Sequence, residues 1–187
     1  MTFSIQRFLS RAVPAVLLLA FLAAPASAQE RGNDEPRVSP NAAVSQTIGT
    51  TEVRITYGRP SVNDREIFGN LVSYDQVWRT GANEATTITV SADVQVEGEP
   101  LSAGTYSLFT IPGSDAWTLI FNSEANIWGT NYDEANDVLR VQVEPESASM
   151  QEMMSFTFEN VTDTSGTCVL HWADVRVPFT ISVAGGQ

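Results

Sequence analysis

Lysine is absent from this 187-residue sequence, whose 22 acidic residues outnumber ten arginines to give a net charge of −12. A basic surface able to neutralise phosphates is therefore excluded, and we expect no nucleic-acid partner. The single cysteine excludes an intramolecular disulfide. Together with the single histidine, it also leaves no zinc-ligand spacing, so the sequence predicts no metal site and no cofactor.

Hydrophobic segments long enough to cross a bilayer are also lacking. The apolar run at residues 12–24 is shorter than the roughly 20 residues that a transmembrane helix needs. Arg7 and Arg11 precede it, and Ala26-Ser27-Ala28 follows it, which is typical of a secretory signal peptide cleaved after Ala28. We therefore expect an exported protein, periplasmic or extracellular, with no membrane span after signal removal.

The rest of the chain is predicted to form one domain at residues 41–183. The polar stretch 29–40 has the composition of a flexible lead-in, and residues 184–187 that of a frayed tail. Loss of residues 1–28 removes two arginines and no acid, so the exported part carries eight arginines, 22 acids and a net charge of −14. A domain of this size buries enough surface to fold without disulfides.

Hydrophobic residues in this domain alternate with polar ones at the period of a β-strand. The alternation predicts about nine short strands, near residues 53–57, 88–90, 94–96, 106–108, 117–121, 139–143, 156–158, 168–172 and 175–181. No amphipathic helix of ordinary length is indicated. Because each strand must bury one face, the sequence predicts an all-β fold, an antiparallel sandwich with jelly-roll-like or Greek-key-like connections.

Three residues that could carry chemistry are given packing roles by the same pattern. Tyr106 follows a tight turn, as in a tyrosine corner that ties a loop to a sheet. Cys168 shares a strand face with apolar neighbours and is predicted to be a buried apolar side chain. His171 lies on the opposite face of that strand, without a serine or cysteine motif beside it.

Two long connections interrupt the alternation, at residues 59–81 and 122–137, and long ordered loops are often functional. The second is compatible with a turn of helix, and its acids do not follow the calcium-loop spacing. The first forms an Arg-rich loop, with polar residues directly after it. Its candidate ligand-binding residues are Arg59, Arg65, Trp78, Arg79, Asn83 and Glu84.

Guanidinium groups bind carboxylates, phosphates and sugar hydroxyls with fixed geometry and stack on aromatic rings. The Arg-rich loop would therefore suit a small polar or anionic ligand, or a glycan. The alternative, which weighs more on general grounds, is that its arginines pair with Glu66, Asp75 and Glu84 to pin the loop to the sandwich.

Several segments closely resemble the exported bacterial family catalogued as domain of unknown function 2911 (DUF2911). They are Tyr57-Gly58-Arg59-Pro60, residues 65–72, 77–88 and 103–112, and Asp137-Val138-Leu139-Arg140-Val141. Residues 78–86, Trp-Arg-Thr-Gly-Ala-Asn-Glu-Ala-Thr, are the most specific of these, and the resemblance extends over about 39–181. It implies an exported, β-rich domain of Gram-negative bacteria, and it brings no established activity and no assigned catalytic residues.

Three functions remain open from the sequence. The first is a non-catalytic binding module that uses the Arg-rich loop. The second is a structural envelope or interaction protein that presents exposed aromatics such as Trp128 and Tyr132. The third is a hydrolase in which Glu84 works with Asp75 or Glu66 as an acid/base pair. The sequence does not predict the oligomeric state.

The acidic, lysine-free composition generates a prediction about salt. Uniform negative charge destabilises a compact state through self-repulsion, and salt screens that repulsion. We expect the thermal unfolding midpoint of the purified protein to rise from low to high sodium chloride concentration. A midpoint that does not change with salt would contradict this role for the acids.

Overall fold

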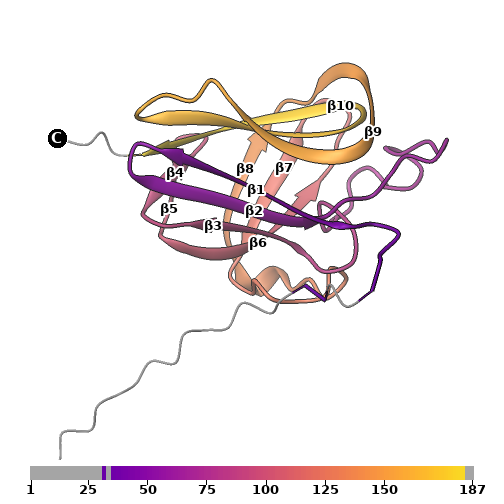
Figure 1. Cartoon of the computed structure of the whole chain (residues 1–187), viewed down its shortest axis with the longest axis horizontal. Coiled ribbons are helices and arrows are strands. Elements are labelled where there is room, and N and C mark those ends of the chain that lie inside the picture. Colours follow the sequence, from indigo (N-terminus) through magenta and orange to yellow (C-terminus); the bar gives the residue numbers. More distant parts are fainter. Residues whose placement is uncertain (1–30, 33–34, 184–187) are drawn as a thin grey trace, which may run out of the picture.

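The computed structural model describes residues 31–32 and 35–183, which form two packed antiparallel sheets (Figure 1). The six-stranded sheet has the order β1 (Asn41–Ile48), β2 (Thr51–Gly58), β3 (Thr86–Val90), β6 (Gly104–Ile111), β7 (Trp117–Asn122) and β8 (Asp137–Val143). The four-stranded sheet has the order β5 (Glu99–Leu101), β4 (Val94–Val96), β10 (Ser165–Val183) and β9 (Glu146–Glu159). The predicted all-β sandwich is confirmed.

The predicted signal peptide and tail fall within residues 1–30 and 184–187, outside the described residues. Within the described part of the chain, no helix is long and apolar enough to span a membrane.

The strands differ from the predicted set in number and length. β1 and β5 are additional, and the last two predicted strands are parts of the single 19-residue strand β10. Ala173 has a positive φ of 52°, and the pairing of β10 with β9 shifts register on both sides of it. A bulge of this kind bends a strand without ending it, so β10 continues through the point where the alternation breaks.

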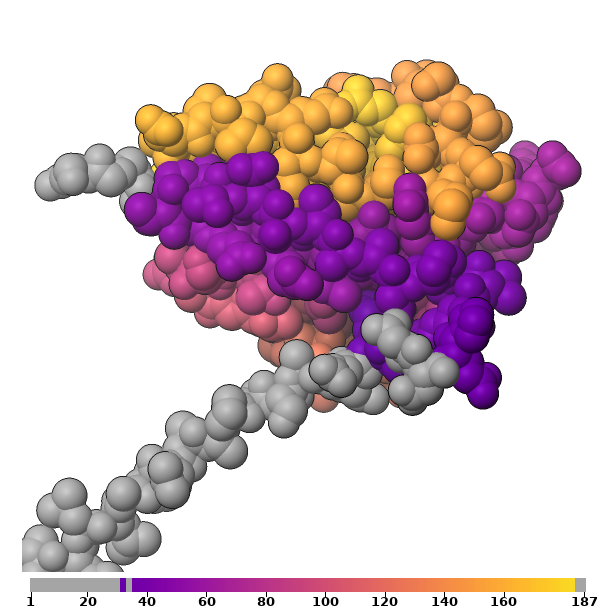
Figure 2. Space-filling model, viewed as in Figure 1, coloured from indigo at the N-terminus to yellow at the C-terminus, as the bar shows by residue number. Residues whose placement is uncertain are grey.

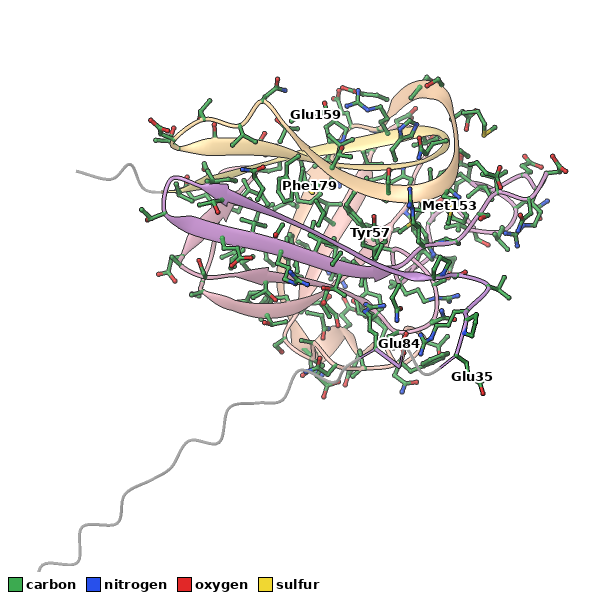
Figure 3. The ribbon with its side chains drawn as sticks, viewed as in Figure 1. Glu35, Tyr57, Glu84, Met153, Glu159 and Phe179 are labelled. Atoms are coloured by element: carbon green, nitrogen blue, oxygen red, sulfur yellow. The ribbon has the colours of Figure 1, made fainter. Side chains whose placement is uncertain are left out.

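The core lies between the inner faces of the two sheets, where Tyr57 and Phe179 lie in Figure 3. Its centre is aromatic. Trp78 stacks on Trp172 with ring centroids 5.8 Å apart, and Phe68 packs edge-on against Trp117 at 5.0 Å. These rings bury a large apolar area and tie the loop that follows β2 to both sheets.

Cys168 and His171 lie as the alternation predicts. Cys168 is fully buried in the core, and its burial raises the pKa of the thiol well above the ordinary value. His171 is half-buried, and its Nε2 lies 3.0 Å from the carbonyl oxygen of Ser149. Tyr106 donates a 2.9 Å hydrogen bond to the carbonyl of Ser102, which confirms the tyrosine corner.

The connection between β2 and β3, residues 59–85, bonds to both sheets. Its first part pairs with β9, where the Val62 amide donates to the Glu152 carbonyl at 2.8 Å. Its second part pairs with β6 through two hydrogen bonds between Trp78 and Thr110, at 2.7 and 2.9 Å. The loop therefore joins the two sheets through main-chain hydrogen bonds.

The connection between β7 and β8, residues 123–136, covers part of the outer face of the six-stranded sheet. It contains the expected helical turn, the 3-10 helix η1 (Glu134–Asn136). Tyr132 packs on Phe109 with ring centroids 4.9 Å apart, and Ser107 donates to the Glu124 carbonyl at 2.6 Å. This loop therefore stands as a fixed wall above β6 and β7.

The aromatic core generates a prediction about stability. Trp172→Ala removes a fully buried ring, and such truncations cost about 3–5 kcal/mol because the cavity does not close. We expect the urea midpoint of unfolding to fall accordingly. Val138→Ala, at a half-exposed position on β8, is the control and should change stability by less than about 0.5 kcal/mol. Equal losses in both variants would contradict this placement of the core.

Candidate functional site

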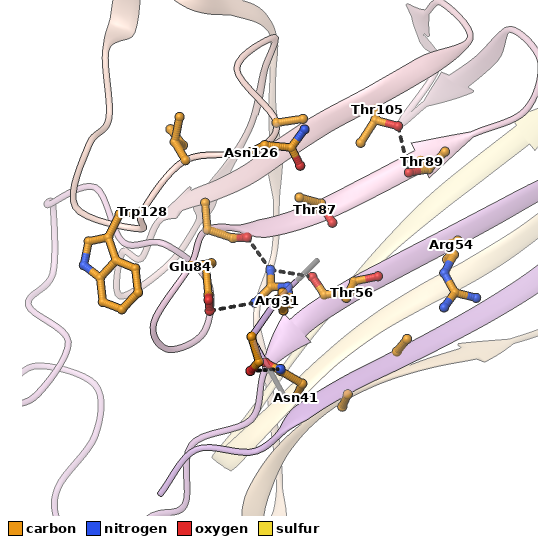
Figure 4. A pocket seen from close by; sticks show the side chains of 16 residues that line it. Arg31, Asn41, Arg54, Thr56, Glu84, Thr87, Thr89, Thr105, Asn126 and Trp128 are labelled. Carbon is orange, nitrogen blue, oxygen red and sulfur yellow. Dashed lines mark hydrogen bonds and ion pairs between the residues drawn. The ribbon is translucent and has the colours of Figure 1, made fainter. Parts of the chain in front are cut away.

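A concavity of about 900 Å³ lies on the outer face of the six-stranded sheet (Figure 4). Strands β1, β2, β3 and β6 supply its floor. The loop 123–136 supplies one wall, and Arg31 and Glu84 lie together at one end. Its volume is in the range of small-molecule binding sites.

Polar side chains form the floor because strand positions alternate between the two faces of a sheet. Val53, Ile55 and Tyr57 of β2 are buried in the core, so Arg54 and Thr56, which alternate with them, face outward. On the neighbouring strand, Thr87 is the register partner of Thr56, and Thr89 that of Arg54. The register therefore collects these side chains into two adjacent rows.

The row of Arg54 and Thr89 continues onto β6, where Thr105 is the register partner of Thr89. The hydroxyl oxygens of Thr89 and Thr105 are 3.0 Å apart and hydrogen-bond to each other. Each hydroxyl both donates and accepts, so the floor presents hydrogen-bonding groups of both kinds.

Asn126 and Trp128 form the wall, and the Trp128 side chain is half-exposed at 51% (Figure 4). Main-chain hydrogen bonds fix this wall against the loop before β3. The Ala85 amide donates to the Ile127 carbonyl at 3.1 Å, and the Gly129 amide donates to the Asn83 carbonyl at 3.1 Å. An indole held in this way offers an apolar face beside polar groups.

Asp137 anchors the other end of the wall loop. Its carboxylate accepts 2.8 Å and 2.6 Å hydrogen bonds from the Asn122 amide and the Tyr132 hydroxyl, and it forms a 2.7 Å ion pair with Arg140. Burial, with the Asp137 hydrogen bond, raises the pKa of Tyr132 to about 12. The phenol therefore remains a donor at neutral pH, and the loop keeps its position.

Among the described residues that line the concavity, Glu84 is the only acid, and it is bound by arginines. Arg37 donates to both of its carboxylate oxygens at 2.7 and 3.0 Å, and Arg31 lies 3.8 Å away. The hydrogen bonds from Arg37 are the main cause that lowers the pKa of Glu84 below its ordinary value. Arg37 belongs to residues 35–40, indigo in Figure 2, which lie beside the start of β1 and the end of β2.

The described residues of the lining carry more positive than negative charge, although the protein is strongly acidic. Arg31 and Arg54 stand against the single carboxylate of Glu84. Arg54 is exposed, and its guanidinium has no hydrogen-bond or ion-pair partner among the described residues (Figure 4). A free guanidinium over a hydroxyl floor can bind a carboxylate or a pair of hydroxyls.

The structure separates the arginines of the predicted Arg-rich loop from the concavity. Arg59 donates to the Met154 carbonyl at 2.8 Å, and Arg65 donates to the carbonyls of Val62 and Ser61 at 2.9 and 2.6 Å. The ion pairs expected from these two residues do not occur within residues 31–32 and 35–183. Instead, Arg59 and Arg65 hold the loop in place through hydrogen bonds to main-chain carbonyls.

The remaining predicted residues also lie away from the concavity, with one exception. Trp78 is in the core, Asn83 donates to the Ser39 carbonyl at 3.3 Å, and the stem of Arg79 packs against Gly129. A Cβ at Gly129 would come within 2.2 Å of Arg79 Cδ, so this contact requires glycine. Burial lowers the pKa of Arg79, whose Nε has no hydrogen-bond partner in the described part of the chain. Only Glu84 reaches the concavity.

The other lining residues were not predicted as a site. Arg54, Thr56, Thr87 and Thr89 occupy the non-core positions of alternating segments, a signal that the sequence does contain. The sequence alone does not show which strands are neighbours in the sheet. Tyr132, expected to be exposed, packs on Phe109 instead, whereas Trp128 is exposed as expected. Within the described residues, no group of three potential metal ligands occurs.

The comparisons with known proteins give one match. A family model described as "Protein of unknown function (DUF2911)" matches residues 39–181, which confirms the resemblance found in the sequence. No curated protein and no solved structure matches the chain significantly.

The Glu84 ion pair generates a prediction about pH. Because its pKa is lowered in the folded state, its stabilisation is complete above the ordinary glutamate value of about 4.3 and disappears as the pH falls through the lowered pKa. We expect Glu84→Gln to be less stable than wild type near neutral pH, with the difference shrinking in acid. Urea unfolding at several pH values measures this.

Glu66→Gln is the control for the pH series, because Glu66 is exposed and forms no ion pair within the described part of the chain. The stability difference between this variant and wild type should stay small across the same pH range. A Glu84→Gln difference independent of pH would contradict the ion pair.

Proposed function

We propose that this chain, which belongs to the DUF2911 family of proteins of unknown function, is a non-catalytic binding module for a small polar or acidic ligand, including glycans. We place the ligand in the concavity on the outer face of the six-stranded sheet and not on the Arg-rich loop. In line with the predicted signal peptide, we propose that the module works after export, in the periplasm or outside the cell.

The observation that carries the proposal is the combination of a free guanidinium, a hydroxyl floor and an exposed indole around one concavity. Arg54 supplies a planar pair of donors for a carboxylate or for neighbouring hydroxyls. The threonines add donors and acceptors at fixed spacing, and Trp128 supplies an apolar surface for the less polar face of a ring. A sugar, or a sugar acid, has complementary groups for all three.

The geometry gives less support to the two alternatives. A carboxylate hydrolase needs two acids at one site, and Glu84 is the one acid among the described lining residues, with a pKa lowered by its bonds to Arg37. Asp75 lies elsewhere, where its amide bonds to the Pro112 carbonyl at 2.8 Å. The interaction-protein alternative named Trp128 and Tyr132 as examples of exposed aromatics, but the Tyr132 ring packs on Phe109.

The proposal generates a prediction about binding. We expect at least one compound in a panel of neutral sugars, sugar acids and small carboxylates to raise the thermal midpoint of the purified protein by mass action. Loss of a hydrogen bond to a charged group costs about 1.5–3 kcal/mol, so Arg54→Ala should weaken binding of that compound about tenfold or more in calorimetric titration. Trp128→Ala should weaken it as well.

Arg176→Ala is the matched control, because this arginine lies on the four-stranded sheet and pairs with Glu146 and Glu159. It should leave the affinity unchanged. A panel in which nothing binds, or a compound that binds wild type and Arg54→Ala equally, would remove the support for this site.

A further inference from the structure

Arg31 occupies one end of the concavity as a bound ligand would. Its side chain is only 8% exposed, and it comes from a segment that belongs to neither sheet. Its Nη2 donates to the Thr56 carbonyl at 2.9 Å and to the Ala85 carbonyl (Figure 4). Its Nη1 faces the Glu84 carboxylate at 3.8 Å. The surroundings of this guanidinium are therefore hydrogen-bond acceptors from the folded domain.

The acceptors come together because of the strand geometry. The pairing of β2 with β3 ends at Thr56 and Thr87, and Ala85 directly precedes β3. The two carbonyl oxygens therefore lie where the ladder stops, next to Glu84. A carboxylate and two carbonyls accept hydrogen bonds and donate none, which matches a group that carries only donors. A guanidinium is such a group, planar and always charged.

We propose that Glu84 and the carbonyl oxygens of Thr56 and Ala85 form a guanidinium-binding subsite, which Arg31 fills in cis and from which a guanidinium-bearing ligand displaces it. The subsite lies in the same concavity as the proposed polar-ligand site, but it takes a group of opposite charge to the carboxylate assigned to Arg54. The concavity would thus bind a carboxylate at Arg54 and a guanidinium at its other end, beside Glu84.

Arg31 is an imperfect occupant. Its Nη1 is buried and makes no hydrogen bond within the described residues, and an unsatisfied buried donor costs free energy. Burial is the largest influence on the Arg31 pKa and lowers it, although Glu84 opposes the shift. A free ligand can adjust its position to satisfy all its donors, whereas Arg31 is limited by its own chain.

The subsite does not need Arg31 to stay assembled. Arg37 holds Glu84 with three hydrogen bonds between 2.7 and 3.0 Å, and the main-chain bonds of Ala85 and Gly129 fix the adjoining loops. When Arg31 leaves, the acceptors therefore remain in place and one end of the concavity, beside Glu84, opens. A guanidinium group from another molecule could then bind to the same acceptors.

The test is a titration of Arg31→Ala with guanidinium chloride, at concentrations below those that unfold the protein and against sodium chloride at equal ionic strength. The readout is the amide NMR shift of Glu84 and Ala85. We expect a saturable shift with an affinity about tenfold higher than in wild type, where Arg31 competes for the subsite. Tetramethylammonium, which has the charge but no N–H donor, should give no saturable shift.

Two further variants control the titration. The double variant Arg31→Ala, Glu84→Gln should lose the saturable response, and Arg176→Ala, which removes an arginine from the other sheet, should titrate like wild type. Equal responses in Arg31→Ala and the double variant, or equal binding of guanidinium and tetramethylammonium, would overturn the subsite. Because the probe is guanidinium alone, this result is independent of whether a polar ligand binds at Arg54.

Discussion

The register between β2, β3 and β6 is the constraint on which both the core and the concavity depend. Side chains alternate between the faces of a strand, so a pairing that buries Ile55 and Ile88 in the core necessarily places Arg54 and Thr89 together on the outer face. A shift by one residue would exchange the two faces. The large cost of exposing the core therefore holds the polar rows in alignment, although these rows contribute little burial themselves.

Glu84 is where the loops and the N-terminal segment contact the six-stranded sheet. Its backbone forms a bridge with Trp128 of the wall loop, and its carboxylate holds Arg37 of the N-terminal segment. It also lies within the connection between β2 and β3 that joins both sheets. One residue thus relates three segments that lie far apart in the sequence. In Figure 3 it lies at the same end of the molecule as Glu35, away from Phe179 in the core.

The sequence was sufficient for the fold class and for the roles of Cys168 and Tyr106, because these follow from local alternation and turn chemistry. It was insufficient for the site, for a physical reason. Clustered arginines such as Arg59 and Arg65 suggested a site, yet hydrogen bonds to nearby carbonyls satisfy them. Arg54, an exposed arginine without a partner among the described residues, belongs to a strand, and its neighbours are set by non-local pairing that a single sequence does not specify.

The location of Arg54 and Arg31 in so acidic a protein also bears on how the proposed ligands would arrive. An acidic surface repels an anion over most approach directions, while a patch of opposite sign within a concave wall draws it in. For the proposed ligands, this charge pattern would make the rate of association depend on the sign of the ligand's charge.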